Sequence, residues 1–220
     1  EILIGLVGSE MCIRDRGLPK MDNQGTLKIL DICAAPGGKS MLAADILNHA
    51  DIDYMLEARD ISEYKVELMQ ENFNRCHLNK AKAVAWDALE PDERWLGQAD
   101  VVIADIPCSG LGVIGRKRDI KYKMTPQAVQ DIVELQEKIL KVAASYVKKG
   151  GKLLFSTCTV NKDENEAHVK WIQDTLKMTP VSLNGTLPGL VHSPTTQQGF
   201  VQLIPGMQDT DGFFISVFEK

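Results

Sequence analysis

Apolar runs alternate with amphipathic stretches along most of this chain of 220 residues. Continuous apolar runs are typical of buried parallel strands, and they predict strands at Leu27–Cys33, Asp53–Ala58, Ala81–Trp86, Ala99–Ile106 and Lys152–Ser156. Apolar residues spaced three and four apart predict helices at Lys39–Leu47, Ser62–His77, Thr125–Lys148 and Asn161–Leu176. This alternation predicts a three-layer α/β domain with a mainly parallel sheet and helices on both faces.

Individual residues predict which helix faces are buried and where one of the helices ends. Within Ser62–His77, the spacing puts Met69 and Cys76 on the apolar face, so we expect both side chains in the core. The glycine pair at 150–151 is expected to end the long third helix, because glycine is a poor helix former.

The two ends of the chain follow the alternating pattern less well. Beyond Leu176 the sequence is irregular until two apolar runs, Phe200–Ile204 and Gly212–Phe218, predict closing strands. The first 16 residues have neither a helical nor a strand period, and they lack the features of a signal peptide. We therefore interpret residues 1–25 as an N-terminal extension foreign to the fold, and residues 26–220 as one domain.

The turn after the first predicted strand is the most informative stretch. It consists mainly of small residues: Cys33, Ala34, Ala35, Pro36, Gly37, Gly38 and Lys39. Small side chains let a ligand approach the backbone, and the unpaired N–H groups of the following helix point toward such a ligand. The order of residues matches neither the GxGxxG dinucleotide fingerprint nor a phosphate-binding P-loop, and Pro36 removes one N–H donor. This turn therefore favours an adenosine-type cofactor over a nucleoside triphosphate.

Carboxylates follow three of the predicted strands. Asp60 lies roughly 20 residues beyond the glycine turn, where a doubly wound fold places the acceptor for ribose hydroxyls. An aspartate there could instead cap the next helix, but Ser62 is available for that role. Asp87 ends the third strand, where an adenine amino group would lie, and Asp105 ends the fourth. Since parallel strands end at one edge, and ligands bind at that edge, we expect these carboxylates to surround a common site.

Two cysteines follow the two central strands. Cys108 and Cys158 lie in turns rich in Pro, Ser, Gly and Thr, where a thiol can face a cleft, although burial as a small apolar residue is the usual fate of a free cysteine. A thiolate is a good nucleophile, and a helix N-terminus lowers the thiol pKa. Asn161 and Glu164 have the spacing of a capping box, so a helix beginning near Asn161 could act on Cys158 in this way.

Composition narrows the cellular context. The chain is 44% hydrophobic and 25% charged, which suits a soluble protein with a core. Its five cysteines include no CxxC pair, so neither a disulfide framework nor a metal site is indicated, and a reducing cytoplasm fits best. No apolar run approaches the ~18 residues that span a bilayer. A net charge of −5 argues against broad non-specific binding to nucleic acids.

Four ordered motifs together resemble the RNA cytosine-C5 methyltransferases: Leu30–Lys39, Asp105–Gly110, Ser156–Thr159 and Asp211–Phe214. The stretch Gly110–Tyr122 is similar to that of the bacterial 16S ribosomal RNA enzymes of the RsmB (Sun or Fmu) type, and the resemblance runs from about Leu27 to the C-terminus. It implies a Rossmann-like class I methyltransferase fold, S-adenosyl-L-methionine as cofactor, and residues 26–220 as the catalytic domain.

The resemblance also implies residue roles. In the family, the residues that match the Cys33–Lys39 turn, Asp60, Asp87 and Asp105 hold the cofactor. The match of Cys158 adds to cytosine C6, because C5 is not nucleophilic unaided, and the match of Cys108 assists elimination of the covalent intermediate. Asp105, when protonated, can hydrogen-bond the base near N3. DNA cytosine methyltransferases place their nucleophile in a Pro-Cys turn, which makes Cys108 the alternative nucleophile.

The resemblance implies that the partner is small-subunit ribosomal RNA. It also implies a monomeric cytoplasmic enzyme that binds neither a metal ion nor a membrane. Family members of the RsmB type carry a helical NusB-like RNA-binding domain ahead of the catalytic one. Nothing in this sequence matches that domain, so we expect a catalytic fragment. The basic cluster Arg116–Lys123 is expected to meet RNA phosphates, and a target base in structured RNA must leave its stack to reach the site.

Three alternatives remain open at this point. Transfer RNA is the main alternative substrate, because related enzymes share all the motifs. A dinucleotide-dependent oxidoreductase could use a similar sheet, although the missing GxGxxG disfavours it. A non-catalytic RNA-binding module would make both cysteines structural.

Overall fold

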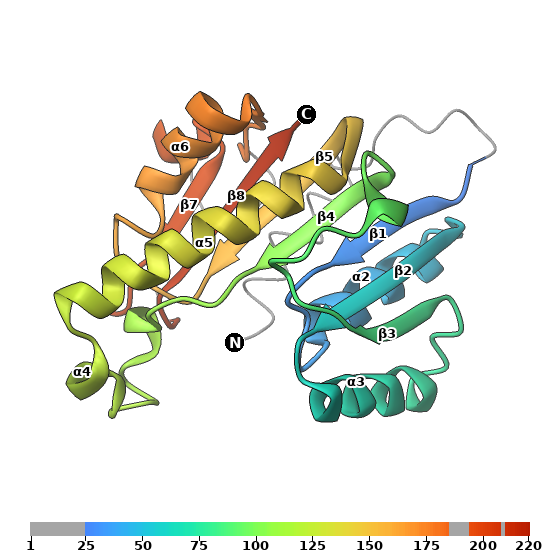
Figure 1. Cartoon of the computed structure of the whole chain (residues 1–220), viewed down its shortest axis with the longest axis horizontal. Coiled ribbons are helices and arrows are strands. Elements are labelled where there is room, and N and C mark those ends of the chain that lie inside the picture. Colours follow the sequence, from blue (N-terminus) through green and yellow to red (C-terminus); the bar gives the residue numbers. More distant parts are fainter. Residues whose placement is uncertain (1–24, 185–193, 208–209) are drawn as a thin grey trace.

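The computed structural model describes residues 25–184, 194–207 and 210–220, so the predicted extension lies outside the described residues except for Gly25. Within these ranges eight strands form one sheet in the order β3-β2-β1-β4-β5-β8-β6, with β7 paired to β8 (Figure 1). The parallel strands are β1 (Leu27–Asp31), β2 (Tyr54–Asp60), β3 (Ala81–Ala85), β4 (Ala99–Asp105) and β5 (Val147–Thr157). The antiparallel part consists of β6 (Thr179–Pro180), β7 (Phe200–Leu203) and β8 (Phe213–Glu219).

The strand order reverses beside β1. The chain builds outward from β1 to β3 and then returns to the other side of β1 with β4, so that Ile29 lies opposite Val101. Ligands of open α/β sheets bind where such a reversal leaves a crevice beyond the carboxyl ends of the strands. The turns that follow β1 and β4 contain the glycine motif and Cys108, and they border this crevice.

Helices cover both faces of the sheet, as predicted. Helices α2 (Gly38–His49) and α3 (Glu63–Arg75) contribute to one core, and α5 (Pro126–Tyr146) and α6 (Glu166–Leu176) contribute to the other (Figure 1). The shorter helices are α4 (Ile120–Lys123) and α7 (Pro194–Gln197), with 3-10 turns η2 at Glu93–Trp95 and η3 at Leu111–Val113. Among the helices described, none is both long and apolar enough to cross a membrane.

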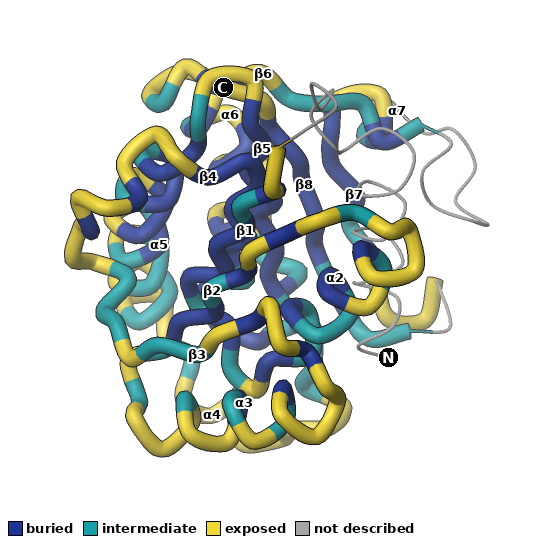
Figure 2. Tube along the Cα trace, turned by 90° about the vertical axis from the view of Figure 1, so that its right-hand side faces the viewer, coloured by how far each residue is buried: buried dark blue, intermediate teal, exposed yellow. Residues whose placement is uncertain are grey.

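The central strands are buried on both sides because successive side chains point to opposite faces. On β4, Val101 and Ile103 belong to the core under α2 and α3, whereas Val102 and Ala104 belong to the core under α5 and α6. Figure 2 shows the buried positions concentrated along the strands and the exposed ones in the outer loops and helix surfaces. This explains why these strands read as continuous apolar runs.

Two predictions about helix ends are wrong. Helix α5 ends at Tyr146, and the glycine pair at 150–151 lies inside β5, where Gly150 adopts a φ of +75°. The pairing with β4 shifts between Ala99 and Val101, an irregularity that lets β5 begin earlier than its apolar run. Cys76 is exposed rather than in the core, because α3 ends at Arg75.

Candidate active site

Two hollows share the carboxyl edge of the parallel strands. The first, which we call the carboxylate cavity, has a volume of about 520 Å³ and borders the ends of the first four strands. Its lining includes the predicted residues Cys33, Ala35, Asp60, Asp87, Asp105, Cys108 and Cys158. The second, the cysteine cleft, has a volume of about 390 Å³. Its lining includes Lys39, Asp105, Arg116, Lys117, Cys158 and Gly212. Ala35, Asp105 and Cys158 line both hollows, so a molecule in one lies next to a molecule in the other.

The glycine turn is shaped by its own backbone. Gly37 adopts a φ of +95°, which favours glycine, and a Cβ there would lie 3.2 Å from Met69 Cγ. Beneath the turn, the fully buried carboxyl of Asp31 accepts a hydrogen bond from Ser40 Oγ at 2.7 Å, which joins the end of β1 to α2. Burial raises the pKa of Asp31 to about 7. The sequence pattern assigns no role to Asp31, although an acid inside an apolar strand indicates a specific role for its carboxyl.

Asp60 and Asp87 both line the carboxylate cavity and are held by nearby backbone donors. Asp60 Oδ1 accepts the N–H of Ser62 at 3.0 Å, and Asp87 Oδ1 accepts the N–H of Leu89 at 2.9 Å. Ser62, the N-cap residue of α3, makes no side-chain cap hydrogen bond, so the capping role predicted for it is wrong. Asp60 accepts the N–H of Ser62 itself and not that of a residue in the first turn of α3, so Asp60 does not cap the helix either.

The carboxylate cavity suits an adenosine group. Ile61 is 70% exposed and Leu89 is 37% exposed, although both are large apolar side chains, and both line the cavity with Trp86. Exposed apolar surface beside carboxylate acceptors matches the two parts of a nucleoside, an apolar ring and a set of donors. These apolar residues were missed in the sequence because isolated apolar residues in loops are common.

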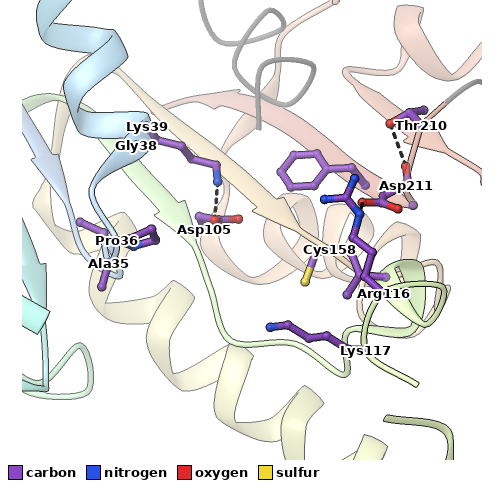
Figure 3. Close-up of a pocket in the computed structure, with 14 residues that line it drawn as sticks. Ala35, Pro36, Gly38, Lys39, Asp105, Arg116, Lys117, Cys158, Thr210 and Asp211 are labelled. Atoms are coloured by element: carbon purple, nitrogen blue, oxygen red, sulfur yellow. Dashed lines mark hydrogen bonds and ion pairs between the residues drawn. The ribbon is translucent and has the colours of Figure 1, made fainter. Parts of the chain in front are cut away.

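Lys39 and Asp105 face each other across the strand ends. Lys39 Nζ lies 2.5 Å from Asp105 Oδ2 (Figure 3). Ser156 Oγ donates to Asp105 Oδ1 at 2.8 Å. Lys39 lines the cysteine cleft and not the carboxylate cavity. The turn is therefore divided between the hollows: Ala34, Pro36, Gly38 and Lys39 line the cysteine cleft, Cys33 lines the carboxylate cavity, and Ala35 lines both.

The two predicted cysteines meet. Cys108 Sγ and Cys158 Sγ lie 3.2 Å apart, within the distance of a sulfur hydrogen bond. The hydrogen bond from Cys108 lowers the pKa of the Cys158 thiol, and the same contact, with burial, raises the pKa of Cys108. Burial also raises the pKa of Cys33. The pair is therefore asymmetric, with the thiolate favoured on Cys158 and the proton on Cys108.

The predicted cause of a low Cys158 pKa is wrong. Helix α6 begins at Glu166, with Asn165 at its N-cap, and so does not start near Asn161. Glu164 does not form a capping box, because its side chain is buried and accepts hydrogen bonds from Ser109. The neighbouring thiol, rather than a helix N-terminus, lowers the pKa of Cys158.

The loop after Cys108 is closed over Cys158 by a pair of glycines. Gly112 donates its N–H to the carbonyl oxygen of Cys158 at 3.1 Å, and Gly212 donates its N–H to the carbonyl oxygen of Gly112 at 2.8 Å. A Cβ on Gly212 would lie 2.6 Å from Gly112 Cα, so neither position has room for a side chain. Asp211 adds an ion pair with Arg116 at 2.9 Å. The Asp211–Phe214 motif thus places the basic loop beside Cys158.

The basic cluster is only partly directed to the site. Arg116 and Lys117 line the cysteine cleft, and Figure 3 shows them beside Cys158, with Asp105 on the other side of the sulfur. Lys123 instead forms an ion pair with Asp119 at 2.7 Å on the exposed surface. Within the described ranges, no group of three or more His, Cys, Asp and Glu side chains could hold a metal ion.

Comparison with known proteins adds to this geometry. A sequence model of the family described as "16S rRNA methyltransferase RsmB/F" matches residues 19–219. This chain belongs to the RsmB/F family. A relative named "Probable ribosomal RNA small subunit methyltransferase B", from Bacillus subtilis (strain 168), is 37% identical over 203 residues, which cover 91% of this chain and 44% of the relative. "Ribosomal RNA small subunit methyltransferase F" of Escherichia coli O7:K1 (strain IAI39 / ExPEC) is 28% identical over 201 residues, covering 90% and 41%.

The chain thus spans less than half the length of these RsmB/F relatives. Among solved structures, NSun6 from Pyrococcus horikoshii with SFG, the S-adenosylmethionine analogue sinefungin, matches with a TM-score of 0.77 and 26% identity over 99% of this chain and 52% of that chain. These likenesses confirm the predicted Rossmann-like class I methyltransferase fold and the resemblance to the RsmB type. The methyl donor of the family is S-adenosylmethionine.

Proposed function

We propose that residues 26–220 are the catalytic domain of an enzyme that forms 5-methylcytosine in small-subunit ribosomal RNA. The observation that carries this proposal is the asymmetric thiol pair, with 3.2 Å between Cys108 Sγ and Cys158 Sγ, at the border of the carboxylate cavity and the cysteine cleft. The names of the B and F relatives support ribosomal RNA as the substrate class.

S-Adenosylmethionine, when bound in the carboxylate cavity, supplies an electrophilic methyl group. Asp60 and Asp87 are acceptors suited to its ribose hydroxyls and adenine amino group, and Ile61 and Leu89 offer apolar surface to the ring. The small residues of the Cys33–Lys39 turn leave room for the remainder of the molecule. The border formed by Ala35 and Asp105 separates this cavity from the cleft where the base would lie.

Cys158 is the nucleophile in our mechanism. Its thiolate, favoured by the hydrogen bond from Cys108, adds to cytosine C6 and makes C5 nucleophilic enough to accept a methyl group. The C5 proton then passes to solvent water, the electrons of the C5–H bond restore the C5–C6 double bond, and the C6–S bond breaks with its electron pair returning to the Cys158 sulfur. Cys108 assists this elimination, because its thiol can hydrogen-bond the departing sulfur as it regains negative charge. The opposite assignment, with Cys108 as nucleophile, is disfavoured by the raised pKa of Cys108.

Charged residues around the cysteine cleft complete the RNA site. Asp105 lies beside an entering base, and Lys39 and Ser156 hold its carboxyl in one position. When protonated, it can hydrogen-bond the base near N3. Arg116 and Lys117 are suited to phosphates flanking a base that has left its stack. These contacts give an acidic chain a local basic surface where RNA is needed.

Trapping with 5-fluorocytosine RNA tests the proposal, because fluorine at C5 prevents the final elimination. After incubation with S-adenosylmethionine and a small-subunit ribosomal RNA transcript that contains 5-fluorocytosine, intact-mass analysis should find a covalent adduct for the wild type and none for Cys158→Ala. Cys108→Ala should accumulate an adduct even with ordinary cytosine. A wild-type protein that binds S-adenosylhomocysteine but forms no adduct would contradict the proposed chemistry. An adduct that forms with transfer RNA but not with ribosomal RNA would support the proposed mechanism and would make transfer RNA the substrate.

A further inference from the structure

A buried carboxylate beneath the two cysteine turns has no part in the chemistry above. Glu164 has no solvent exposure, and its oxygens accept the N–H of Ser109 at 2.8 Å, the hydroxyl of Ser109 at 2.5 Å and the Nε2 amide of Gln136 at 3.0 Å. These donors are neutral, and together they offset the cost of burying the carboxylate. An acid kept in the interior by three donors holds those donors in a defined geometry.

The carboxylate is tied to the backbone on both sides of Cys108. Ser109 follows Cys108 and is held directly through its N–H. Pro107 precedes Cys108, and its carbonyl oxygen accepts a hydrogen bond from Gln136 Nε2 at 2.9 Å, the same amide nitrogen that donates to Glu164. The position of the Cys108 backbone therefore depends on one buried acid and one buried amide.

The same network reaches the turn that contains Cys158. Thr159 follows Cys158, and its hydroxyl lies 2.8 Å from Ser109 Oγ and 3.4 Å from Glu164 Oε1. Ser109 and Thr159 are buried, with exposed fractions of 3% and 0%. The residue after each cysteine is thus joined to its counterpart and to Glu164. A shift of this carboxylate would change the separation of the two turns.

We propose that Glu164 is a positioning residue that sets the separation of the Cys108 and Cys158 sulfurs and thereby the rate of release of the covalent intermediate. The part concerning release rests on the proposed function, whereas the part concerning the sulfur separation does not. A carboxylate is required because all its neighbours donate, and a glutamine in its place would turn an NH₂ group toward another donor. Glutamine is otherwise nearly the same size, so the variant Glu164→Gln changes hydrogen bonding with little change in volume.

Thiol crosslinking tests the separation without RNA. Diamide accepts two electrons and two protons from a thiol pair, so that an S–S bond forms and diamide becomes the hydrazine. We expect the wild type to form a Cys108–Cys158 disulfide rapidly and Glu164→Gln to form it at least about tenfold more slowly, as followed by peptide mass spectrometry. The matched control is Glu166→Gln, an exposed acid two residues away, which should crosslink as the wild type does. Equal rates for Glu164→Gln and the wild type would overturn the proposal.

The release step is tested by comparing two partial reactions. Glu164→Gln should form the 5-fluorocytosine adduct within about threefold of the wild-type rate, yet turn over ordinary cytosine RNA at least about tenfold more slowly and accumulate a covalent adduct. A parallel fall in both rates would indicate a general structural role and overturn the inference. A wild-type protein without any adduct would reject the proposed function instead, while the crosslinking result would still decide the sulfur separation.

A second variant covers the case in which Glu164→Gln does not fold. Ser109→Ala removes only the hydroxyl that donates to Glu164 and contacts Thr159, and it keeps the backbone N–H contact. It should slow crosslinking in the same direction by a smaller factor, with circular dichroism and binding of S-adenosylhomocysteine unchanged. If a folded Ser109→Ala protein crosslinks at the wild-type rate, the hydrogen bonds around Glu164 do not set the separation of the Cys108 and Cys158 sulfurs.

Discussion

The carboxylate cavity and the cysteine cleft lie on the same sheet edge but are assembled differently. Most of the carboxylate cavity comes from turns that directly follow β1, β2, β3 and β4, and its key side chains are held by contacts over two residues, as Asp60 is by Ser62. The cysteine cleft joins segments far apart in the chain. Cys158 follows β5, and its sulfur contacts that of Cys108, which is 50 residues away in the sequence. Gly212, which directly precedes β8, lines the cleft and donates its N–H to Gly112.

This difference predicts different sensitivities. A cavity made of local turns loses a contact when one of its residues changes, while its remaining walls stay in place. A cleft made of distant segments depends on how those segments pack, so a change at one backbone contact can move the reactive sulfur. Alkylation of Cys158, followed at the peptide level, and binding of S-adenosylhomocysteine report on the two regions separately.

The largest effect is expected for Cys158→Ala. Without the proposed nucleophile, transfer of labelled methyl groups from S-adenosylmethionine to RNA should fall by at least about a thousandfold, since the covalent route is lost. Binding of S-adenosylhomocysteine, measured by calorimetry, should be unchanged because the carboxylate cavity keeps its acceptors. Methyl transfer near the wild-type rate would reject Cys158 as the nucleophile.

Gly112→Ala is expected to disturb the cleft through its backbone. The new Cβ would lie 2.7 Å from the carbonyl oxygen of Cys158, which a rigid turn cannot accommodate. Overpacking of this kind costs about 1–3 kcal/mol, so the free energy of unfolding measured with urea should fall by that amount and methyl transfer by about tenfold or more. Gly115→Ala is the control, because its Cβ would meet no atom within 4 Å. Equal effects of both variants would remove the special role of the glycine contact.

Asp60→Asn should weaken the carboxylate cavity alone. Asparagine keeps one acceptor for the N–H of Ser62 but loses the charge, and a hydrogen bond to a charged group contributes about 1.5–3 kcal/mol. We therefore expect the affinity for S-adenosylhomocysteine to fall by about tenfold or more, with the alkylation rate of Cys158 unchanged. Asp45→Asn, on the exposed surface of α2, is the control and should bind normally. Equal affinities of the two variants for S-adenosylhomocysteine would show that Asp60 does not contribute to cofactor binding.

Cys108→Ala should move the pH dependence of Cys158 alkylation. The hydrogen bond from Cys108 lowers the pKa of Cys158, so its thiolate forms at lower pH and the alkylation rate rises earlier as pH increases. Without the donor the pKa of Cys158 rises, so the rising limb of its alkylation rate against pH should move to higher pH by about one unit. A shift of this size corresponds in free energy to one ordinary hydrogen bond. Cys108→Ser keeps a donor and should shift less. A limb that moves to lower pH would contradict the assigned direction.

The smallest effect is expected for Lys117→Ala. Lys117 is exposed and lines the cysteine cleft, so its loss should raise the KM for RNA by about threefold, with a weaker dependence on salt. Binding of S-adenosylhomocysteine should not change. The control is Lys149→Ala, because Lys149 lies near the start of β5, at the opposite end of that strand from Cys158. A KM that rises equally in both variants would assign the effect to net charge rather than to the cleft.

Features that depend on neighbours in the chain could be predicted from the sequence alone. The alternation of strands and helices, the small-residue turn from Cys33 to Lys39 and the positions of Asp60 and Asp87 at strand ends all follow from short-range geometry. The four motifs also carried the family resemblance, which the comparisons bear out. Placement of these groups at one edge follows from parallel strands, whose carboxyl ends point the same way.

Tertiary structure decided how these groups meet. The 3.2 Å contact of the sulfurs, the ion pair of Lys39 with Asp105 and the buried position of Glu164 join segments that lie far apart in the sequence. Such contacts depend on the strand order β1-β4-β5-β8 and on how the helices pack against it, and no local pattern encodes either. The spacing of Asn161 and Glu164 therefore suggested a helix cap, whereas burial made Glu164 the link between the two cysteine turns.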